Sequence, residues 1–269
     1  MTRMKLKLWA TASAVIVAGG LAACSPGGEG GGEAAGGATS AAVGEGGEAG
    51  ESAAGEGGGE HGEAGVAEAY SGLEGPARTA LRLQHLKGFA LIAQRVAQAG
   101  KGPEAGALVG QGVLEVYDPA QDQFGGFDAA PLRAAEAAGS NSAAEVTRAL
   151  AQGVAALDAA RPAGVNQADI AARMVDLSAG LYSHVIQADF NDPIEYQHAL
   201  GAALSAKDAL THGRTALRQR NAQAYDEGMR ELDRFIALWP ATDVPDAPTP
   251  YRDVLAQSSR VRLALAPLL

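Results

Sequence analysis

DIAARMVDLSAGLYSHVIQADFNDPIEYQHALG, residues 169–201, decides the fold of this chain. Its first half repeats an apolar residue every three or four positions, which is the period of a helix with one buried face. The residues of this stripe are Ile170, Met174, Leu177, Leu181 and Val185. Its second half opens on Asp192 and Pro193, an N-cap residue followed by a proline at the first helical position. The stretch therefore predicts two helices joined by a short reversal of the chain.

The same kind of pattern runs through most of residues 71–269. This segment is rich in Ala, Leu, Arg and Gln and has few runs of β-branched residues, a composition that favours helices. Ser142 and Glu145 have the spacing of a capping box. Short connections between long amphipathic helices indicate an all-α, up-and-down helical bundle. We predict helices at about residues 75–99, 103–116, 142–161, 166–185, 193–220, 222–238 and 251–265, and a mostly irregular segment at 118–139.

The first residues of the chain have the pattern of an export signal. Arg3, Lys5 and Lys7 precede an uncharged, apolar segment at 8–20, which is shorter than the roughly 20 residues that span a bilayer. The segment ends in LAAC at 21–24, with the only cysteine of the chain. This arrangement resembles the lipobox of bacterial lipoproteins; the alternative is a conventional signal peptide followed by an unrelated cysteine.

The lipobox resemblance has consequences for the location of the protein. It implies that residues 1–23 are a signal peptide and that Cys24 becomes the lipid-modified, palmitate-bearing first residue of the mature protein. Two or three acyl chains anchor a protein stably to a membrane. Ser25 in place of an aspartate resembles the outer-membrane sorting pattern of Gram-negative lipoproteins. The expected location is the periplasmic side of a membrane, with the outer membrane preferred.

Residues 24–70 have the composition of a tether. Glycine, alanine and glutamate dominate, and the segment contains no Lys or Arg. Such a sequence cannot bury enough apolar surface to offset the entropy lost on ordering, so we predict a disordered, extended linker. Much of the formal charge of −10 lies here. The predicted organisation is thus a signal peptide (1–23), an acidic tether (24–70) and a helical domain (71–269).

Glu195 and His198 raise the question of a metal site, because they lie three residues apart in a predicted helix. Glu195 is also at the third helical position after the Asp192 cap, where a glutamate can accept a hydrogen bond from the N-cap backbone N–H. We prefer this capping interpretation. An angular projection places His198 away from the apolar face of its helix, toward solvent or a groove.

Two other histidines are candidates for metal ligands. His184 and His198 are equally distant in sequence from Asn191, so a reversal at Asn191 would place them at one level of the hairpin. Together with Glu195 or Asp189 they would form a loose surface site of imidazole and carboxylate, of the type that suits iron, zinc or copper. His85 lies on the apolar stripe of the helix at 75–99, and a hydrogen bond to a buried partner is its preferred role. Lys207 and Arg214 also fall on an apolar face, and buried cations need partners.

Four segments resemble a group of helical envelope lipoproteins from alphaproteobacteria. They are LQHLKG (83–88), VLEVY (113–117), NDPIEYQHALG (191–201) and SSRVRLAL (258–265). The group is distantly similar to the periplasmic helical region of bacterial iron permeases and to imelysin-like proteins. The resemblance implies a helical bundle near an iron-acquisition system, with His85, Glu115 and Glu195 as the matching polar positions. The chain departs from it at Leu108 and Gln111, where histidines are expected.

The sequence contains no pattern that predicts catalysis. It lacks a Gly-x-Ser-x-Gly motif, and GALVGQG at 106–112 lacks the Lys-Ser/Thr of a phosphate-binding loop. An acidic, exported chain is also not expected to bind nucleic acid. Two hypotheses remain. The first is a tethered protein that binds a metal, iron or zinc, or a small ligand, in a metal-uptake complex. The second is an envelope protein that binds another protein without metal or enzymatic activity.

Overall fold

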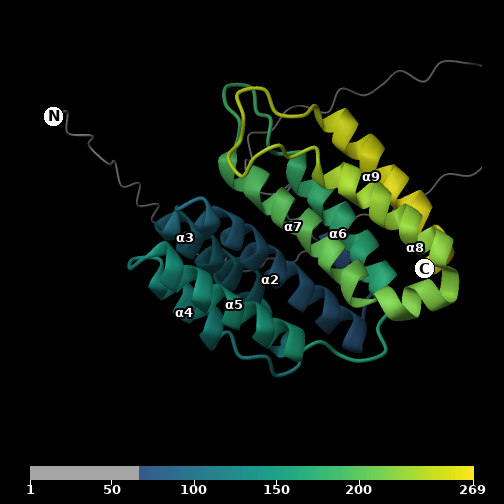
Figure 1. Cartoon of the computed structure of the whole chain (residues 1–269), viewed down its shortest axis with the longest axis horizontal. Helices are drawn as coiled ribbons and strands as arrows, with labels where there is room; N and C mark the ends of the chain where they lie inside the picture. The colour runs from purple at the N-terminus through teal and green to yellow at the C-terminus, as the bar shows by residue number, and fades with distance from the viewer. Residues whose placement is uncertain (1–66) are drawn as a thin grey trace, which may run out of the picture. The chain divides into compact units, whose positions relative to one another are not determined.

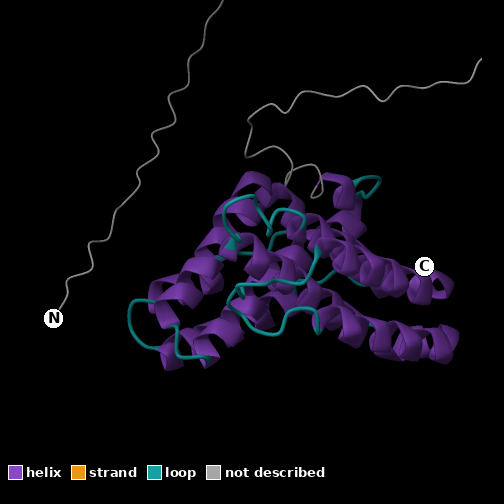
Figure 2. Ribbon diagram, turned by 90° about the horizontal axis from the view of Figure 1, so that it is seen from above, coloured by secondary structure: helices purple, strands orange, loops and turns teal. Residues whose placement is uncertain are grey.

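The computed structural model describes residues 67–269, and these residues form helices joined by loops, without a β-strand (Figures 1 and 2). The α-helices are α2 (Gly75–Gln98), α3 (Gly102–Gly112), α4 (Ala130–Ala138), α5 (Ala143–Ala159), α6 (Gln167–Tyr182), α7 (Pro193–His212), α8 (Arg214–Ile236) and α9 (Tyr251–Leu265). A π-helix, η1 (Val113–Tyr117), and two 3-10 helices, η2 (Asp118–Phe124) and η3 (Ala266–Leu268), complete the set. The predicted all-α bundle is confirmed for this part of the chain.

The predictions for the signal peptide, Cys24 and nearly all of the tether lie outside the described residues. Ala69 and Tyr70, the last apolar residues of the predicted tether, are described and are buried in the core. In the described part of the chain, no helix is both long and apolar enough to cross a bilayer.

The hairpin of α6 and α7 lies at the centre of the fold, because α2 packs on one side of it and α8 and α9 on the other (Figure 1). Local caps start both helices. The Asn166 side chain accepts a hydrogen bond from the backbone N–H of Ala168, and Asp192 caps α7 in the same manner. The Ser178 hydroxyl then donates to the carbonyl of Ala199, which ties the two helices together inside the core.

Helix α2 crosses α7 at a point where both helices carry a glycine. A methyl group added at Gly88 would stand 3.0 Å from the carbonyl oxygen of Gly201, and one added at Gly201 would stand 2.8 Å from that of Gly88. Because neither Gly88 nor Gly201 has a side chain, the two helix backbones can come into contact here. On its other side α2 packs against α3 and α5, and α4 joins these two helices into an outer layer (Figure 1).

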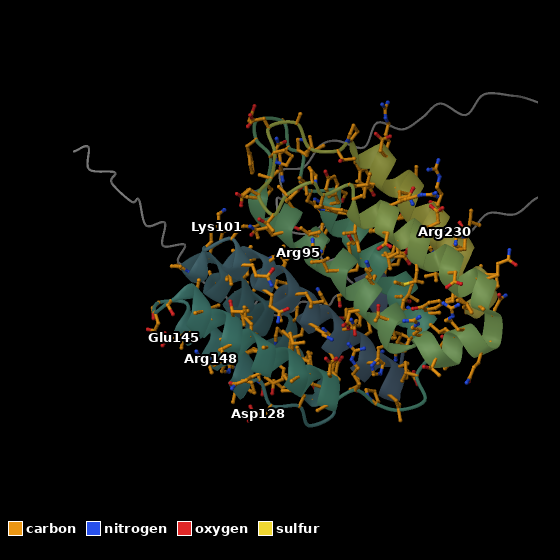
Figure 3. All side chains as sticks on the ribbon, viewed as in Figure 1. Arg95, Lys101, Asp128, Glu145, Arg148 and Arg230 are labelled. Atoms are coloured by element: carbon orange, nitrogen blue, oxygen red, sulfur yellow. The ribbon has the colours of Figure 1, made fainter. Side chains whose placement is uncertain are left out.

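The outer faces of the bundle are charged, with Arg148 on α5 and Arg230 on α8 directed away from the core (Figure 3). Lys207 and Arg214, which we predicted on an apolar face, are also at the surface. Lys207 is 43% exposed and pairs with Asp233 at 2.6 Å, and Arg214 is exposed. The prediction is wrong for Arg214 because a new helix, α8, begins at this residue, and for Lys207 because its long side chain reaches the surface and pairs with Asp233 of α8.

The buried cations of this domain are instead Lys87 and Arg161, whose side chains are 3% and 7% exposed. The Lys87 ammonium lies 2.7 Å from Asp158 and 2.8 Å from Asp208, and the Arg161 guanidinium pairs with both carboxylates. Gln84 donates a hydrogen bond to Asp208 as well. This cluster joins α2, α7 and the end of α5.

Several helix boundaries differ from those expected from sequence; for example, α3 ends at Gly112 and α6 at Tyr182. The helix predicted at 193–220 ends at His212, and its remainder belongs to α8. The predicted break at Asn221 is present as a residue with non-helical backbone angles inside α8. The segment 118–139 contains η2 and α4, and its residues Phe124 and Phe127 pack edge to face or tilted against each other and against Tyr117 of η1. Tertiary packing thus orders a segment that has little local helical signal.

Candidate metal site

The start of α7 positions Glu195 and His198. The Asp192 carboxylate accepts hydrogen bonds from the backbone N–H groups of Ile194 at 2.8 Å and of Glu195 at 3.2 Å, which confirms Asp192 as the N-cap. The backbone N–H of Asp192 itself donates to the carbonyl of Val185 at 2.7 Å. The group that Glu195 would cap is therefore already satisfied by the hairpin.

The capping interpretation of Glu195 is consequently wrong. Its Oε2 atom is buried and has no hydrogen-bond partner. An unpaired, buried carboxylate oxygen is uncommon, because the desolvation cost is not offset by any contact. The sequence pattern of a capping box was present, but the long-range bond from Asp192 to Val185 displaced it.

His198 is buried, with 8% of its surface exposed, and so does not face solvent as expected. Its ring lies 4.6 Å from the ring of Phe89, centroid to centroid. The angular projection failed because α7 is covered on two sides, by α6 and by α2, whereas the projection assumed one apolar face. The Nε2 atom of His198 is a second buried polar atom without a hydrogen-bond partner.

Electrostatic effects at this site favour the uncharged forms of Glu195 and His198. Burial raises the pKa of Glu195 to about 7, and the negative charges of Asp192 and Glu115 add to the rise. Burial lowers the pKa of His198 to about 4, against the opposing influence of Asp192. His198 is therefore neutral near pH 7, with a ring nitrogen lone pair available to a metal ion.

Glu115 is brought toward this site by the π-helix η1, where it occupies the central position. Burial raises its pKa, and its charge contributes to the raised pKa of Glu195. A single π-helical turn next to an α-helix is frequent at functional sites, since it redirects the side chains that follow. Glu115 is exposed on η1 and acts on Glu195 through its charge, whereas Glu195 and His198 lie together on the first turns of α7.

His85 is buried on α2 and accepts or donates a hydrogen bond at Nδ1 with the hydroxyl of Tyr70, at 3.0 Å. The preferred prediction of a hydrogen-bonded core histidine is confirmed. Burial, with added repulsion from His198 and Arg82, lowers the pKa of His85 to about 3. Its ring lies 5.8 Å from Phe89, so Phe89 stands between the two histidine rings.

His184 does not stand opposite His198. The bonds from Asp192 to Val185 and from Ser178 to Ala199 show that the hairpin reverses between residues 188 and 189 rather than at Asn191. Ala179 is therefore at the level of His198, and His184 is at the level of Pro193. His184 is partly buried in the α6–α7 connection, and none of the contacts above involves it.

Gln197 is a neighbour of the site that sequence reasoning missed. Its amide donates to the Glu104 carboxylate at 2.8 Å and to the Thr242 carbonyl at 3.3 Å. Glu104 is 93 residues earlier in the chain, so no local pattern could connect the two residues. This contact fixes the exposed end of α7 to α3 and to the loop before α9.

The site as it stands provides two donors on one helical turn, the Glu195 carboxylate and the His198 imidazole. Among residues 67–269, no group of three or more His, Cys, Asp and Glu side chains is arranged to hold a metal ion. A third donor, such as Glu115, would have to rotate toward the pair. No protein-family model, no curated protein and no solved structure matches this chain.

Proposed function

We propose that this chain is a lipid-anchored protein of the cell envelope that faces the periplasm and binds a transition-metal cation, iron or zinc, as an accessory component of metal acquisition. One observation carries the proposal: Glu195 Oε2 and His198 Nε2 are buried one helical turn apart and neither has a hydrogen-bond partner. A bound cation would satisfy both atoms at once.

The chemistry of the pair supports a transition metal. Imidazole nitrogen with carboxylate oxygen suits zinc and iron, whereas magnesium and calcium prefer oxygen ligands alone. Burial, and then the negative charges of Asp192 and Glu115, raise the pKa of Glu195 in the metal-free protein. A bound cation would lower the pKa of Glu195 again, since it stabilises the ionised carboxylate.

Metal binding is expected to stabilise the wild-type protein but not the variants Glu195→Gln and His198→Ala. At a free metal concentration of 100 times Kd, the gain is about 2.7 kcal/mol, which raises Tm by about 5–10 °C in a domain of this size. Glu195→Gln removes the anionic ligand and His198→Ala the imidazole, so each should abolish most of the shift. Thermal melts with and without Zn²⁺ or Fe³⁺, with elemental analysis of the purified protein, measure both effects.

Two controls make this test specific. Glu145→Gln and His212→Ala change the same residue types at exposed positions and should keep the full metal-dependent shift. In metal-free buffer, Glu195→Gln should be at least as stable as wild type, because it replaces an unpaired buried carboxylate by a neutral amide. A wild-type protein that retains no metal and shows no shift would exclude the metal proposal.

Membrane anchoring through Cys24 is a separate prediction. If the lipobox resemblance is correct, Cys24→Ser should abolish labelling by a palmitate analogue and yield an unprocessed or soluble species. Fractionation of cells into membrane and soluble parts, with metabolic labelling, measures both. Ser25→Ala is a suitable control, because it should leave labelling intact. Undiminished labelling of Cys24→Ser would show that the lipid is attached elsewhere.

The alternative function is that of an envelope interaction protein without metal or enzymatic activity. Three large apolar side chains at and beside the α6–α7 connection favour it, because Ile186, Phe190 and Ile194 are 45%, 57% and 45% exposed. Exposed apolar groups close together are typical of protein interfaces. Co-purification of a defined membrane complex, lost on Phe190→Ser and unaffected by metal chelation, would favour this alternative.

A further inference from the structure

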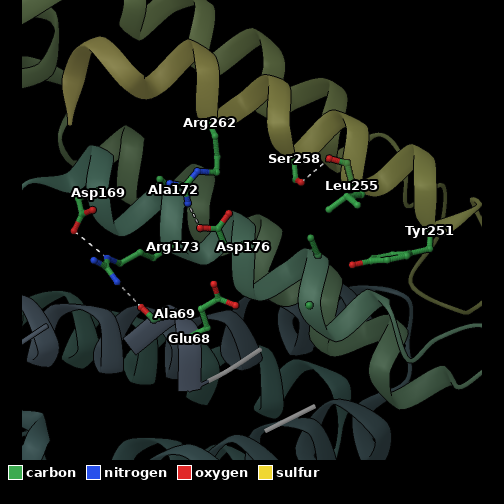
Figure 4. A pocket seen from close by; sticks show the side chains of 12 residues that line it. Glu68, Ala69, Asp169, Ala172, Arg173, Asp176, Tyr251, Leu255, Ser258 and Arg262 are labelled. Carbon is green, nitrogen blue, oxygen red and sulfur yellow. Dashed lines mark hydrogen bonds and ion pairs between the residues drawn. The ribbon is translucent and has the colours of Figure 1, made fainter. Parts of the chain in front are cut away.

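A groove of about 560 Å³ lies between α6 and α9, on a different part of the domain from the candidate metal site (Figure 4). Ala172, Ala179 and Gly180 of α6 leave it hollow, since they have small side chains or none. Its size is within the range of small-molecule sites in proteins. The segment just before α2, with Glu68 and Ala69, lines it as well.

The charges that line this groove do not balance. It contains three carboxylates, Glu68, Asp169 and Asp176, and two guanidinium groups, Arg173 and Arg262. Both guanidinium groups are already engaged. Arg173 bonds Asp169 at 3.2 Å and donates to the carbonyls of Ala69 and Ser71, and Arg262 pairs with Asp176.

Glu68 is left as the excess negative charge. In Figure 4 its carboxylate points toward that of Asp176 across the groove. Burial raises the pKa of Asp176 against the opposing charge of Arg262, and the charge of Glu68 raises it further. A cation placed between Glu68 and Asp176 would remove this repulsion.

Apart from Ser258, whose hydroxyl donates to the carbonyl of Leu255, the remaining lining is apolar. Tyr251 is 37% exposed and Leu255 is 47% exposed, and both extend from α9 over the groove (Figure 4). An exposed tyrosine ring and an exposed leucine one helical turn apart provide a surface for a hydrophobic or aromatic group. The groove thus pairs an anionic end with an apolar end.

We propose that this groove binds a small organic cation, in which a primary amine or guanidinium group is joined to a short apolar body. The cationic group would donate hydrogen bonds to Glu68, and the apolar body would pack on Tyr251 and Leu255. Charge complementarity selects this class of ligand, because an anion would meet the Glu68 carboxylate, and a neutral ligand would leave its charge unpaired.

Isothermal titration calorimetry of the full-length protein in detergent, with a chelator present, tests the proposal independently of any metal. The probe is 2-phenylethylamine, compared with neutral 2-phenylethanol and anionic phenylacetate of nearly equal size. We expect the amine to bind about threefold to fivefold more tightly than the alcohol, because Glu68 is exposed and solvent screens its ion pair with the ligand. Phenylacetate should show no binding.

Matched variants locate the binding. Glu68→Gln should weaken binding of the amine about threefold to fivefold and reduce its preference over the alcohol, whereas Leu255→Ser should weaken binding of amine and alcohol alike. Glu74→Gln, an exposed glutamate outside the groove, should change nothing. Equal affinity for amine and alcohol, no effect of Glu68→Gln, or no heat with the amine would overturn the proposal. Binding of a basic peptide without binding of the amine would overturn it in favour of a protein partner.

Discussion

Asp208→Ala is expected to lower the free energy of unfolding by about 3–5 kcal/mol, the cost of leaving a buried charge without its partner. Asp208 accepts hydrogen bonds from Lys87 and Gln84 and pairs with Arg161. Both cations are almost completely buried. Without Asp208 they would share the single carboxylate of Asp158, and Arg161 already has one nitrogen, Nη1, without a partner.

Thermal and denaturant unfolding measure this effect, and Tm should fall by about 10 °C. Asp233→Ala is the matched control. It removes the partner of Lys207 from a pair whose side chains are 43% and 55% exposed, so its cost should stay below about 1 kcal/mol. Equal costs for the two variants would show that the cluster of Lys87, Arg161, Asp158 and Asp208 does not hold the domain together.

The same cluster predicts a pH dependence. Burial pushes the pKa of Asp208 upward, but the hydrogen bonds and charges of Lys87, Gln84 and Arg161 outweigh it and hold the pKa below its ordinary value. A carboxyl group with a lowered pKa stabilises the fold above its unfolded pKa of about 4, and this contribution is lost as the pH falls through the lowered value. The difference in stability between wild type and Asp208→Ala should therefore be constant above about pH 5 and shrink in acid.

Local sequence signals predicted the positions of the helices well, but they predicted poorly which residues pack against one another. Asp192, Asn166 and Ser142 each cap the helix that the sequence assigned to them, because a cap bonds to backbone groups two or three residues away. The break at Gly213 was missed, although glycine is common at helix ends, because Leu210 and Leu217 are seven residues apart and continue one apolar stripe across it. Helix boundaries are predictable where they depend on neighbours in sequence.

The candidate site was predictable only as a set of residue types. Glu195 and His198 were identified by their spacing, but both assigned environments were wrong. The Glu195 prediction failed because the backbone N–H of Asp192, to which a capping glutamate would bond, already donates to the carbonyl of Val185. The His198 prediction failed because α2 covers the face of α7 that the projection left open. Both causes are contacts made outside α7, one with the α6–α7 connection and one with α2, and a projection of α7 alone contains neither.

Gly201→Ala is the second variant for which we expect a large change in stability, because Gly201 lies at the contact between α2 and α7. In an ordinary helix this change stabilises by about 1 kcal/mol, since glycine is a poor helix former. Here the new methyl group would meet the Gly88 carbonyl oxygen at 2.8 Å and the Ile92 side chain at 3.1 Å. The carbonyl belongs to a helical backbone and cannot turn away, so the helices must separate, at a net cost of about 1–3 kcal/mol.

Gly110→Ala is the matched control for this prediction. Its methyl group would also stand close to another atom, at 2.6 Å, but that atom is a carboxylate oxygen of the flexible Glu136 side chain. Glu136 is exposed and can move, so helix propensity should dominate and Gly110→Ala should be neutral or stabilising by up to about 1 kcal/mol. Denaturant unfolding of the two variants should give changes of opposite sign.

Separation of α2 from α7 would also change the packing around the candidate metal site. Phe89 is the residue after Gly88, and its ring contacts His198, which is three residues before Gly201. Gly201→Ala should therefore weaken any metal-dependent rise in Tm as well as lower the stability of the metal-free protein, whereas Gly110→Ala should alter neither unfavourably. If Gly201→Ala stabilises the protein as Gly110→Ala does, the two helices do not touch at these glycines, and the packing that buries His198 must have another origin.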